Sequence, residues 1–383
     1  INKSYIQSIM SKKNLLIFMP SLEDGGVEKN FFLIINYLSN KFSNIFLITS
    51  DKLIKKKINH KIKLIGPNSS IWQTKSRYPK YFICILHLIM FLIVNKNTLI
   101  FALQANLYAT LIAKIFGKKI ITRSNASSEG WSKNVLKKLI YKVFLKFSDQ
   151  VIVNSYDFKK ELDNKFKINS EVIFNPLNKF EIQKKSREKL KFNFYKKNKI
   201  KLITVGRLVD QKDQLTLLRA INLIKEKNIQ LLIIGNGKKE KKLIDYIVKK
   251  KLSSVVKIIP YKTNPYKYIK KANIFILTSK FEGLPNVLLE ALALKKYIIS
   301  TNCPTGPREI LLSGKGGDLV KIGDYKTLSK KILNYSIKNN KLQKKLNKKI
   351  NLGYQNLNRF DYSLNMKKYY NLIKKHYVGG KII

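Results

Sequence analysis

Two glutamates stand eight positions apart in the second half of the chain, on either side of a sharp turn. The stretch reads Glu282-Gly-Leu-Pro-Asn-Val-Leu-Leu-Glu290 and follows a β-type apolar run. Gly283 and Pro285 shape the turn, and Asn286 is expected to cap the helix that follows. Carboxylates accept hydrogen bonds from sugar hydroxyls, and the first N–H groups of a helix favour anionic oxygen. The alternative is that each glutamate only stabilises the helix N-terminus.

A basic loop precedes this motif. Arg207 and Lys212 follow another β-type apolar run, and Gly206 between the run and Arg207 lets a ligand approach the backbone. A forked guanidinium and a point charge at a turn from strand to helix suit a diphosphate. The alternative is a surface ion pair of Arg207 with Asp210 or Asp213.

A glycine turn follows the next β-type run. It reads Gly235-Asn-Gly237 and lacks the third glycine of a dinucleotide-binding fingerprint. Such a turn permits a close approach of the backbone to a ligand, but tight turns also use glycine for conformational reasons alone. By itself this motif does not predict a function.

The chain contains few residues that hold metals. It has two cysteines, three histidines and no Asp-x-Asp sequence; these residues are Cys84, Cys303, His60, His87 and His376. Two cysteines exclude a disulfide scaffold and a four-cysteine zinc site, and they indicate a reducing compartment. The sequence therefore predicts no metal site.

The elements that must position these residues alternate along the chain. Short β-type runs alternate with longer helical stretches, which predicts an α/β fold with parallel sheets covered on both faces. The pattern breaks in a polar, basic stretch at 179–200, which we interpret as a linker. We therefore expect a first Rossmann-like domain at 1–178, a second at 201–355 and a C-terminal helix at 356–383 that packs back on the first. In such sheets ligands bind outside the carboxyl ends of the strands, so two facing domains place the site in the cleft between them.

The charge of the chain is strongly positive. Lys and Arg number 76 against 23 Asp and Glu, a net charge of +53, but only seven of the basic residues are Arg. Three explanations of this charge are possible. Since nucleic-acid surfaces use Arg heavily, the excess of Lys favours a coding bias as the first explanation, attraction to an anionic membrane as the second and binding of nucleic acid as the last. The longest apolar run, Tyr81 to Val94, has 14 residues, whereas a spanning helix needs about 20. It predicts a buried or interfacial helix.

Taken together, these motifs resemble family 4 (group 1) glycosyltransferases of the GT-B fold. The resemblance is carried by Gly206-Arg207-Leu208 with Lys212, Gly235-x-Gly237, Glu282 to Glu290, and Ser300-Thr-Asn-Cys-Pro-Thr-Gly-Pro-Arg-Glu309. It covers nearly the whole chain, and Gly25-Gly26 matches the Gly-rich first loop of the family. The C-terminal motifs are most similar to those of bacterial enzymes that extend polysaccharides or polyprenyl-diphosphate-linked glycans.

The resemblance implies a role for each residue. Arg207 and Lys212 would hold the donor diphosphate, Glu282 would bind the donor sugar, and Glu290 would bind the ribose hydroxyls. The catalytic set would thus be Glu282, Arg207 and Lys212. The backbone of the loop would contact the sugar and the β-phosphate, and several glycines would let loops approach the donor; these residues are Gly283, Leu284, Pro285, Asn286 and Val287, with Gly25, Gly26, Gly206, Gly235 and Gly237.

The implied function is a retaining, hexosyltransferase-type glycosyltransferase. It would move a sugar from a nucleotide-diphosphate donor, expected to be UDP-linked, to a cell-surface glycan such as lipopolysaccharide, expected to be lipid-linked. It would need no cofactor, bind no nucleic acid, and work in the cytoplasm at the inner face of the membrane. One departure is that no His follows the run at 119–122, which leaves open whether Arg123 or Asn125 takes that place. A sugar-nucleotide 2-epimerase of the same fold and a basic nucleic-acid-binding protein are the rival hypotheses.

Overall fold

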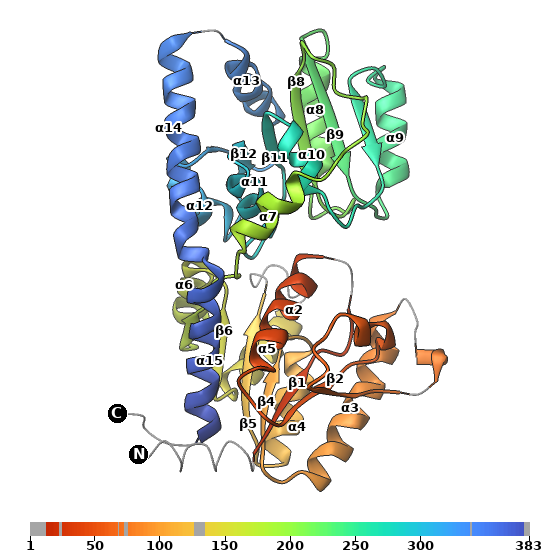
Figure 1. The fold of residues 1–383 in the computed structure, drawn as a ribbon, viewed down its shortest axis with the longest axis vertical. Coiled ribbons are helices and arrows are strands. Elements are labelled where there is room, and N and C mark those ends of the chain that lie inside the picture. Colours follow the sequence, from red (N-terminus) through yellow and green to blue (C-terminus); the bar gives the residue numbers. More distant parts are fainter. Residues whose placement is uncertain are drawn as a thin grey trace. The chain divides into compact units, whose positions relative to one another are not determined.

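The computed structural model covers residues 1–383 and describes 13–22, 25–67, 69–72, 76–125, 135–337 and 339–378. It divides into two compact units (Figure 1). The first unit combines Ile1–Pro176 with Ser363–Ile383, and the second is Leu177–Tyr362. Each unit is built on its own parallel sheet with helices in the connections.

The first unit contains a seven-stranded parallel sheet in the order β3-β2-β1-β4-β5-β6-β7. Its central strands β1, β4 and β6 are mostly apolar and buried, as expected where helices cover both sides of a parallel sheet, whereas the edge strands β3 and β7 are partly exposed. The strands are β1 (Asn14–Phe18), β2 (Ile45–Ile48), β3 (Ile62–Ile65), β4 (Thr98–Ala102), β5 (Lys119–Ser124), β6 (Gln150–Val153) and β7 (Ser170–Val172). The α-helices are α2 (Gly26–Leu38), α3 (Arg77–Val94), α4 (Asn106–Ile115), α5 (Val135–Lys146), α6 (Tyr156–Glu161) and α15 (Tyr362–Val378).

The second unit repeats this arrangement with six parallel strands in the order β10-β9-β8-β11-β12-β13. The strands are β8 (Ile200–Val205), β9 (Ile229–Ile234), β10 (Val256–Ile259), β11 (Ile274–Leu277), β12 (Tyr297–Thr301) and β13 (Asp318–Val320). The α-helices are α7 (Lys179–Ser186), α8 (Gln214–Leu223), α9 (Glu240–Lys249), α10 (Tyr266–Lys271), α11 (Asn286–Ala293), α12 (Pro307–Ile310), α13 (Tyr325–Ser336) and α14 (Asn340–Asn356). Both sheets confirm the predicted α/β class.

The segment 179–200, which we expected to be a linker, is part of the second unit. It begins with α7, whose Ile182 is buried and which packs against α10 and α11. Farther along, Phe192 lies edge-on to Tyr268, with ring centroids 5.3 Å apart. The many lysines of this segment made it resemble a linker in the sequence, although a few apolar side chains anchor it to the second unit.

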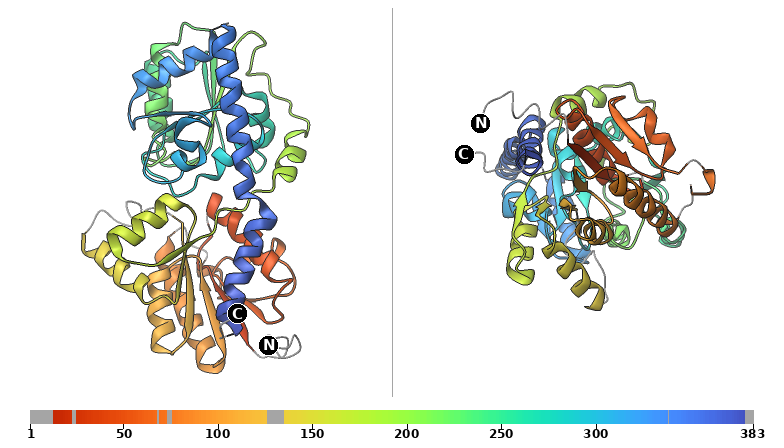
Figure 2. Two further views of the ribbon diagram at one scale, coloured as in Figure 1. Left: turned by 90° about the vertical axis from the view of Figure 1, so that its left-hand side faces the viewer. Right: turned by 90° about the horizontal axis from the view of Figure 1, so that it is seen from below.

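The C-terminal helix α15 belongs to the first unit, and the division falls at Tyr362 rather than at 355. Figure 2 shows this blue helix along the first unit. Tyr369 and Tyr377 are completely buried, and Lys13 donates a 2.7 Å hydrogen bond to the backbone oxygen of Tyr377. Two buried aromatic side chains and a bond to the start of the chain fix the helix in place.

Helix α3 extends four residues farther toward the N-terminus than the apolar run at 81–94. In the described part of the chain it is the one helix that is long and apolar enough to cross a membrane, a criterion that core helices also meet. One side of it is in the core, where Cys84, Leu88, Phe91 and Leu92 are buried. The helix therefore packs on its own sheet along that side.

Candidate active site

The candidate site lies at the carboxyl edge of the second sheet. β8, β11 and β12 are neighbours in this sheet, and all run in the same direction. Their carboxyl ends therefore meet at one edge, which is where open α/β sheets bind ligands. The loops after these strands carry Arg207 and Lys212, Glu282, and Thr305 respectively.

Lys212 and Glu282 form an ion pair in this loop cluster. The Lys212 Nζ lies 2.5 Å from Glu282 Oε1, and the hydroxyl of Ser279 donates to the same oxygen at 2.6 Å. Glu282 is 6% exposed, and the Lys212 side chain is half-buried. A buried carboxylate needs such partners, because unpaired burial of a charge is costly.

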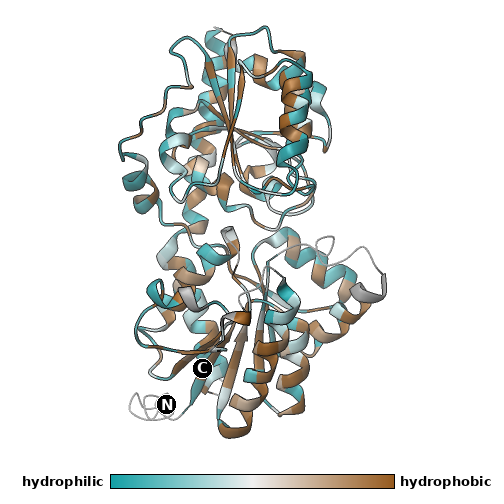
Figure 3. Ribbon diagram, turned by 90° about the vertical axis from the view of Figure 1, so that its right-hand side faces the viewer, coloured by the Kyte–Doolittle hydropathy of each residue, from teal (hydrophilic) through white to brown (hydrophobic). Residues whose placement is uncertain are grey.

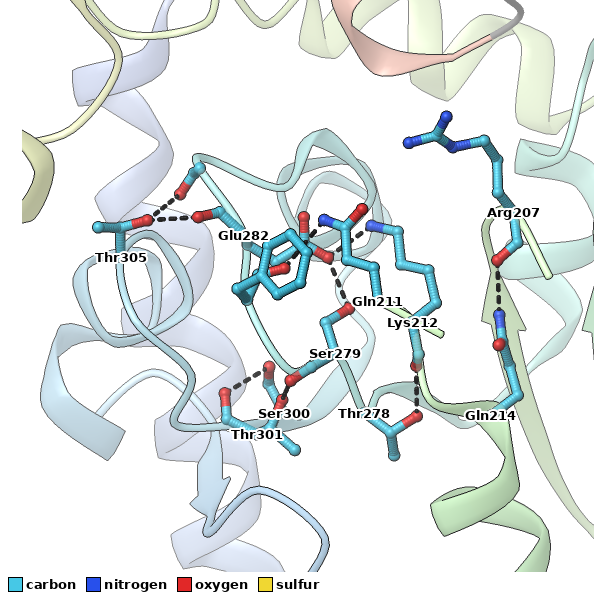
Figure 4. A network of polar contacts seen from close by, with 12 residues as sticks. Arg207, Gln211, Lys212, Gln214, Thr278, Ser279, Glu282, Ser300, Thr301 and Thr305 are labelled. Atoms are coloured by element: carbon cyan, nitrogen blue, oxygen red, sulfur yellow. Dashed lines mark hydrogen bonds and ion pairs between the residues drawn. The ribbon is translucent and has the colours of Figure 1, made fainter. Parts of the chain in front are cut away.

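Hydrogen bonds from side chains to backbone oxygens hold the loops together (Figure 4). Gln211 donates to the backbone oxygen of Phe281 at 2.9 Å, and Thr278 donates to that of Lys212 at 3.1 Å. From the loop after β12, the Thr305 hydroxyl donates to the backbone oxygen of Glu282 at 2.5 Å. These bonds fix the position of the ion pair from both neighbouring strands.

Arg207 differs from Lys212 in its surroundings. It is exposed, and its backbone oxygen accepts a 2.9 Å hydrogen bond from Gln214 at the start of α8. Figure 4 shows its guanidinium extended away from the drawn network. Asp210, one of the two partners considered above, pairs instead with Lys239 at 3.0 Å, and that cation lowers the pKa of its carboxyl group.

The glycine turn after β9 is built against the Arg207 loop. A Cβ on Gly235 would lie 2.0 Å from the backbone oxygen of Gly206, and one on Gly237 would lie 2.3 Å from that of Leu208. Both glycines have a positive φ. The turn is therefore required by close backbone packing, which explains these two glycines without any ligand.

Helix α11 begins one residue earlier than we predicted. Pro285 occupies the N-cap position and Asn286 is the first helical residue, so the expectation that Asn286 caps the helix is wrong. Pro285 also has no N–H, so it cannot donate to a donor phosphate. Amide donors in this stretch can come only from Gly283, Leu284, Asn286 and Val287.

Glu290 lies inside α11 and is buried. Its Oε1 accepts a 3.2 Å hydrogen bond from the hydroxyl of Tyr266, at the start of α10. The two glutamates of the motif thus have different neighbours. Glu282 faces a cation and a serine, whereas Glu290 faces a phenol.

Several residues that position the site were not assigned a role from the sequence. Ser279, Thr305 and Tyr266 contact the two glutamates or their loop. Gly306 has φ +76°, and a Cβ there would lie 2.0 Å from the backbone oxygen of Gly283. The Thr305-Gly306-Pro307 sequence was the available signal, because such a turn after a strand suggests close packing against a neighbouring loop.

In the first unit, Arg123 is buried at the end of β5, with 1% exposure. Its Nε donates to the hydroxyl of Tyr369 at 2.7 Å, one terminal nitrogen donates to Asn175 Oδ1 at 2.7 Å, and the other donates to Asn125. Arg123 therefore joins β5 to α15 and to Asn175, near the end of the segment Ile1–Pro176. Gly25 and Gly26, also in this unit, are exposed at the start of α2.

The described residues offer no group of three or more His, Cys, Asp or Glu side chains that could hold a metal ion. Both cysteines are buried and free. Burial raises the pKa of Cys303 to about 12, with a further contribution from Glu282, and burial likewise raises that of Cys84 to about 12. Thiols with so high a pKa are poor nucleophiles at neutral pH.

Comparisons with known proteins agree with this architecture. Residues 185–352 match the family described as glycosyl transferases group 1. The chain is 35% identical over 216 residues to an uncharacterized glycosyltransferase of Methanocaldococcus jannaschii, which covers 52% of this chain and 53% of the relative. The match therefore spans about half the length of that relative.

A longer match is to the N-acetylgalactosamine-N,N'-diacetylbacillosaminyl-diphospho-undecaprenol 4-alpha-N-acetylgalactosaminyltransferase of Campylobacter jejuni. The two chains are 27% identical over 323 residues, 81% of this chain and 86% of that one. Among solved structures, Anabaena HepE in complex with UDP superposes with a TM-score of 0.73 at 15% identity, covering 95% of this chain and 100% of that chain.

The two parallel sheets and the likeness to this solved structure define the GT-B fold. Residues 185–352, which make up most of the second unit, are therefore similar to the glycosyl transferases of group 1.

Proposed function

We propose that this enzyme transfers a sugar, with retention, from a UDP-sugar to a lipid-linked glycan. The observation that carries the proposal is the cationic loop after β8, which carries the exposed Arg207 and pairs Lys212 with the buried Glu282 at the carboxyl edge of the sheet. This arrangement offers two positive donors for a diphosphate and a fixed carboxylate for sugar hydroxyls.

The reaction follows from what these groups can stabilise. The bond between the anomeric carbon and the β-phosphate oxygen breaks, and its electron pair leaves with UDP. The acceptor hydroxyl forms the new glycosidic bond on the same face and gives its proton to the leaving phosphate. Because charge builds up on that phosphate, Arg207 and Lys212 lower the barrier by electrostatic stabilisation.

The Lys212–Glu282 ion pair gives Glu282 a second role. A carboxylate that accepts from an ammonium and a hydroxyl is held in one orientation. When a diphosphate binds, Lys212 can donate to both the carboxylate and a phosphate oxygen, because an ammonium has three N–H bonds. Glu282 thus positions Lys212 for the phosphate while it binds the sugar itself.

The choice of donor and acceptor is supported by the relatives. The structure of Anabaena HepE contains UDP, and the Campylobacter jejuni relative is named for an undecaprenol-diphosphate-linked acceptor. A lipid-linked acceptor requires the enzyme to work at a membrane surface, on the cytoplasmic side, where nucleotide sugars are made. We expect no cofactor other than the nucleotide sugar.

A donor screen tests this function. Purified protein is heated with UDP-, GDP-, ADP- and dTDP-sugars, and the expected result is a rise in Tm with UDP-sugars only. The stabilising donor is then incubated with and without an undecaprenyl-diphosphate glycan. A glycan extended by one sugar supports the proposal. Conversion of the UDP-sugar to its epimer without acceptor would instead identify an epimerase.

A further inference from the structure

Three helices of the first unit lie on the same face of its sheet. The connections from β3 to β4, from β4 to β5 and from β5 to β6 all cross the sheet in one direction. Because such crossovers are right-handed, they place α3, α4 and α5 together and α2 on the opposite face. Helix α4 packs against both α3 and α5, and the rings of Tyr81 and Tyr108 meet between α3 and α4 with centroids 6.4 Å apart.

The outer side of this helical layer is apolar. Of the 24 large hydrophobic side chains that are exposed in the described chain, 12 belong to these three helices, and one more, Phe147, directly follows α5. Brown segments run along the helices of the first unit in the lower part of Figure 3. The exposed residues, here named the apolar layer, are Tyr78, Phe82, Leu86, Met90, Ile93, Val94, Tyr108, Leu111, Ile115, Leu139, Ile140, Val143 and Phe147.

The same helices carry charge of one sign. Their sequences contain seven Lys or Arg residues and no Asp or Glu. Arg77 and Lys146 are exposed beside the apolar layer, and Lys114 is exposed there too but pairs with Asp149 at 2.8 Å. A surface that is both apolar and cationic matches the two parts of an anionic bilayer, since the apolar side chains enter the acyl boundary and the lysines meet the headgroups.

We propose that the apolar layer docks the first unit onto an anionic lipid bilayer. Helix α3 lies in the plane of the interface and does not cross it, because Cys84, Leu88 and Phe91 on its other side are in the core of the unit. A second copy of the chain fits this surface less well. A two-fold dimer through the layer would bring the basic residues of one copy against those of the other, and like charges at an interface are costly.

The biological purpose of this surface rests on the proposed function, because a lipid-linked acceptor is available only at a membrane. The binding itself can be measured without donor or acceptor. A protein that binds vesicles but transfers no sugar would refute the function alone, and a protein that transfers sugar but does not bind vesicles would refute the docking surface alone.

Sedimentation with vesicles tests the proposal. The vesicles contain phosphatidylglycerol and phosphatidylcholine in equal parts, or phosphatidylcholine alone. The variant carries Phe82→Ser, Met90→Ser, Leu111→Ser and Phe147→Ser. A matched control carries four similar changes at exposed apolar residues of the second unit, namely Leu223→Ser, Ile244→Ser, Val248→Ser and Ile322→Ser.

We expect the parent and the control to bind the anionic vesicles, and the variant to bind at least about tenfold more weakly with an unchanged Tm. Binding should weaken in high salt and on phosphatidylcholine alone, because the cationic part is screened or has no partner. Hydrogen exchange at 77–94 should slow with vesicles, while that at 240–249 should not change.

Equal vesicle binding by the variant and the parent would overturn the proposal. So would a parent dimer, seen by light scattering, that becomes a monomer in the variant while vesicle binding stays the same. In that case the apolar layer would be an interface between two copies of the chain.

Discussion

Two arginines stand at strand ends in the two sheets, and they have opposite surroundings. Arg207 follows β8 in the second unit and is exposed, whereas Arg123 ends β5 in the first unit and is 1% exposed. Arg207 extends from the loop that also carries Lys212, the ion-pair partner of Glu282. Arg123 donates to Tyr369 and Asn175, which lie in segments of the chain next to the boundary between the units.

This difference teaches that a cation at a strand end is a functional candidate only when it can reach a ligand. The two sheets share one strand order, which begins β3-β2-β1-β4 in the first sheet and β10-β9-β8-β11 in the second. Arg207 follows the first strand of its sheet along the chain and Arg123 ends the fifth strand of the other, so both stand at the carboxyl end of a parallel strand. That position alone does not separate the two arginines. Their burial and their partners do: Arg123 holds α15 on its unit, whereas a role of Arg207 in donor binding stays our proposal.

The largest expected effect is on the two glutamates of the site. Glu282→Gln should lower kcat by about 100-fold, since its contact with the sugar strengthens as the anomeric bond breaks. Glu290→Gln should instead raise the KM for the donor by about tenfold and leave kcat nearly unchanged, because the ribose is remote from that bond. Steady-state kinetics on both variants measures the difference.

UDP binding provides the control for these two variants. UDP has the ribose but lacks the sugar that is transferred, so Glu290→Gln should weaken its binding more than Glu282→Gln does. The opposite order would refute the assigned roles. If both variants lost Tm but kept normal kinetics in the folded fraction, the glutamates would serve only the helix.

The next effect is on the two cations. Arg207→Ala and Lys212→Ala should each weaken UDP binding by about 1.5–3 kcal/mol, the value of a charge-assisted contact. They should differ in stability, since Lys212→Ala removes the cation from the buried Glu282, whereas Arg207 is exposed. Calorimetry with UDP and a melting curve test both. Kd values within about twofold of the parent for both variants would show that this loop does not hold the diphosphate.

Much of this site was predictable from the sequence because its motifs are local. The glycine turn and the basic loop each lie within one strand-to-helix connection, and the Glu282–Glu290 motif runs from such a connection into α11. The structure places all three at the carboxyl edge of the second sheet. Their roles in binding stay predictions.

The remaining features depend on contacts between distant parts of the chain. The bond from Arg123 to Tyr369 joins residues 246 positions apart, and the bond from Lys212 to Glu282 joins residues 70 apart. No local pattern encodes such pairs. The helix α7 was missed for a related reason, since its buried Ile182 stands alone among lysines and gains its packing only from α10 and α11.

A smaller effect is expected in the first unit. Arg123→Met should reduce the free energy of unfolding of that unit by about 1–3 kcal/mol, because it removes the hydrogen bonds that Arg123 donates to the buried Tyr369 hydroxyl and to Asn175. UDP affinity should stay the same. Arg219→Met, at an exposed position of α8, is the matched control and should change neither quantity. A loss of UDP affinity in Arg123→Met with an unchanged Tm would move Arg123 into the donor site and remove the contrast with Arg207.

The smallest expected effect is that of chelation. Enzymes that hold a diphosphate through a divalent ion supply it with oxygen ligands, mostly carboxylates. In this enzyme the proposed donors are Arg207, Lys212 and amides at the start of α11, and Glu282 already accepts from Lys212 and Ser279. Transfer should therefore stay within about twofold of its initial rate in excess EDTA, a change of less than about 0.4 kcal/mol. Added Mg²⁺ or Mn²⁺ should not increase it. Complete loss with EDTA and recovery with either ion would show that the cationic loop does not suffice, and that the charge of the leaving phosphate is balanced in another way.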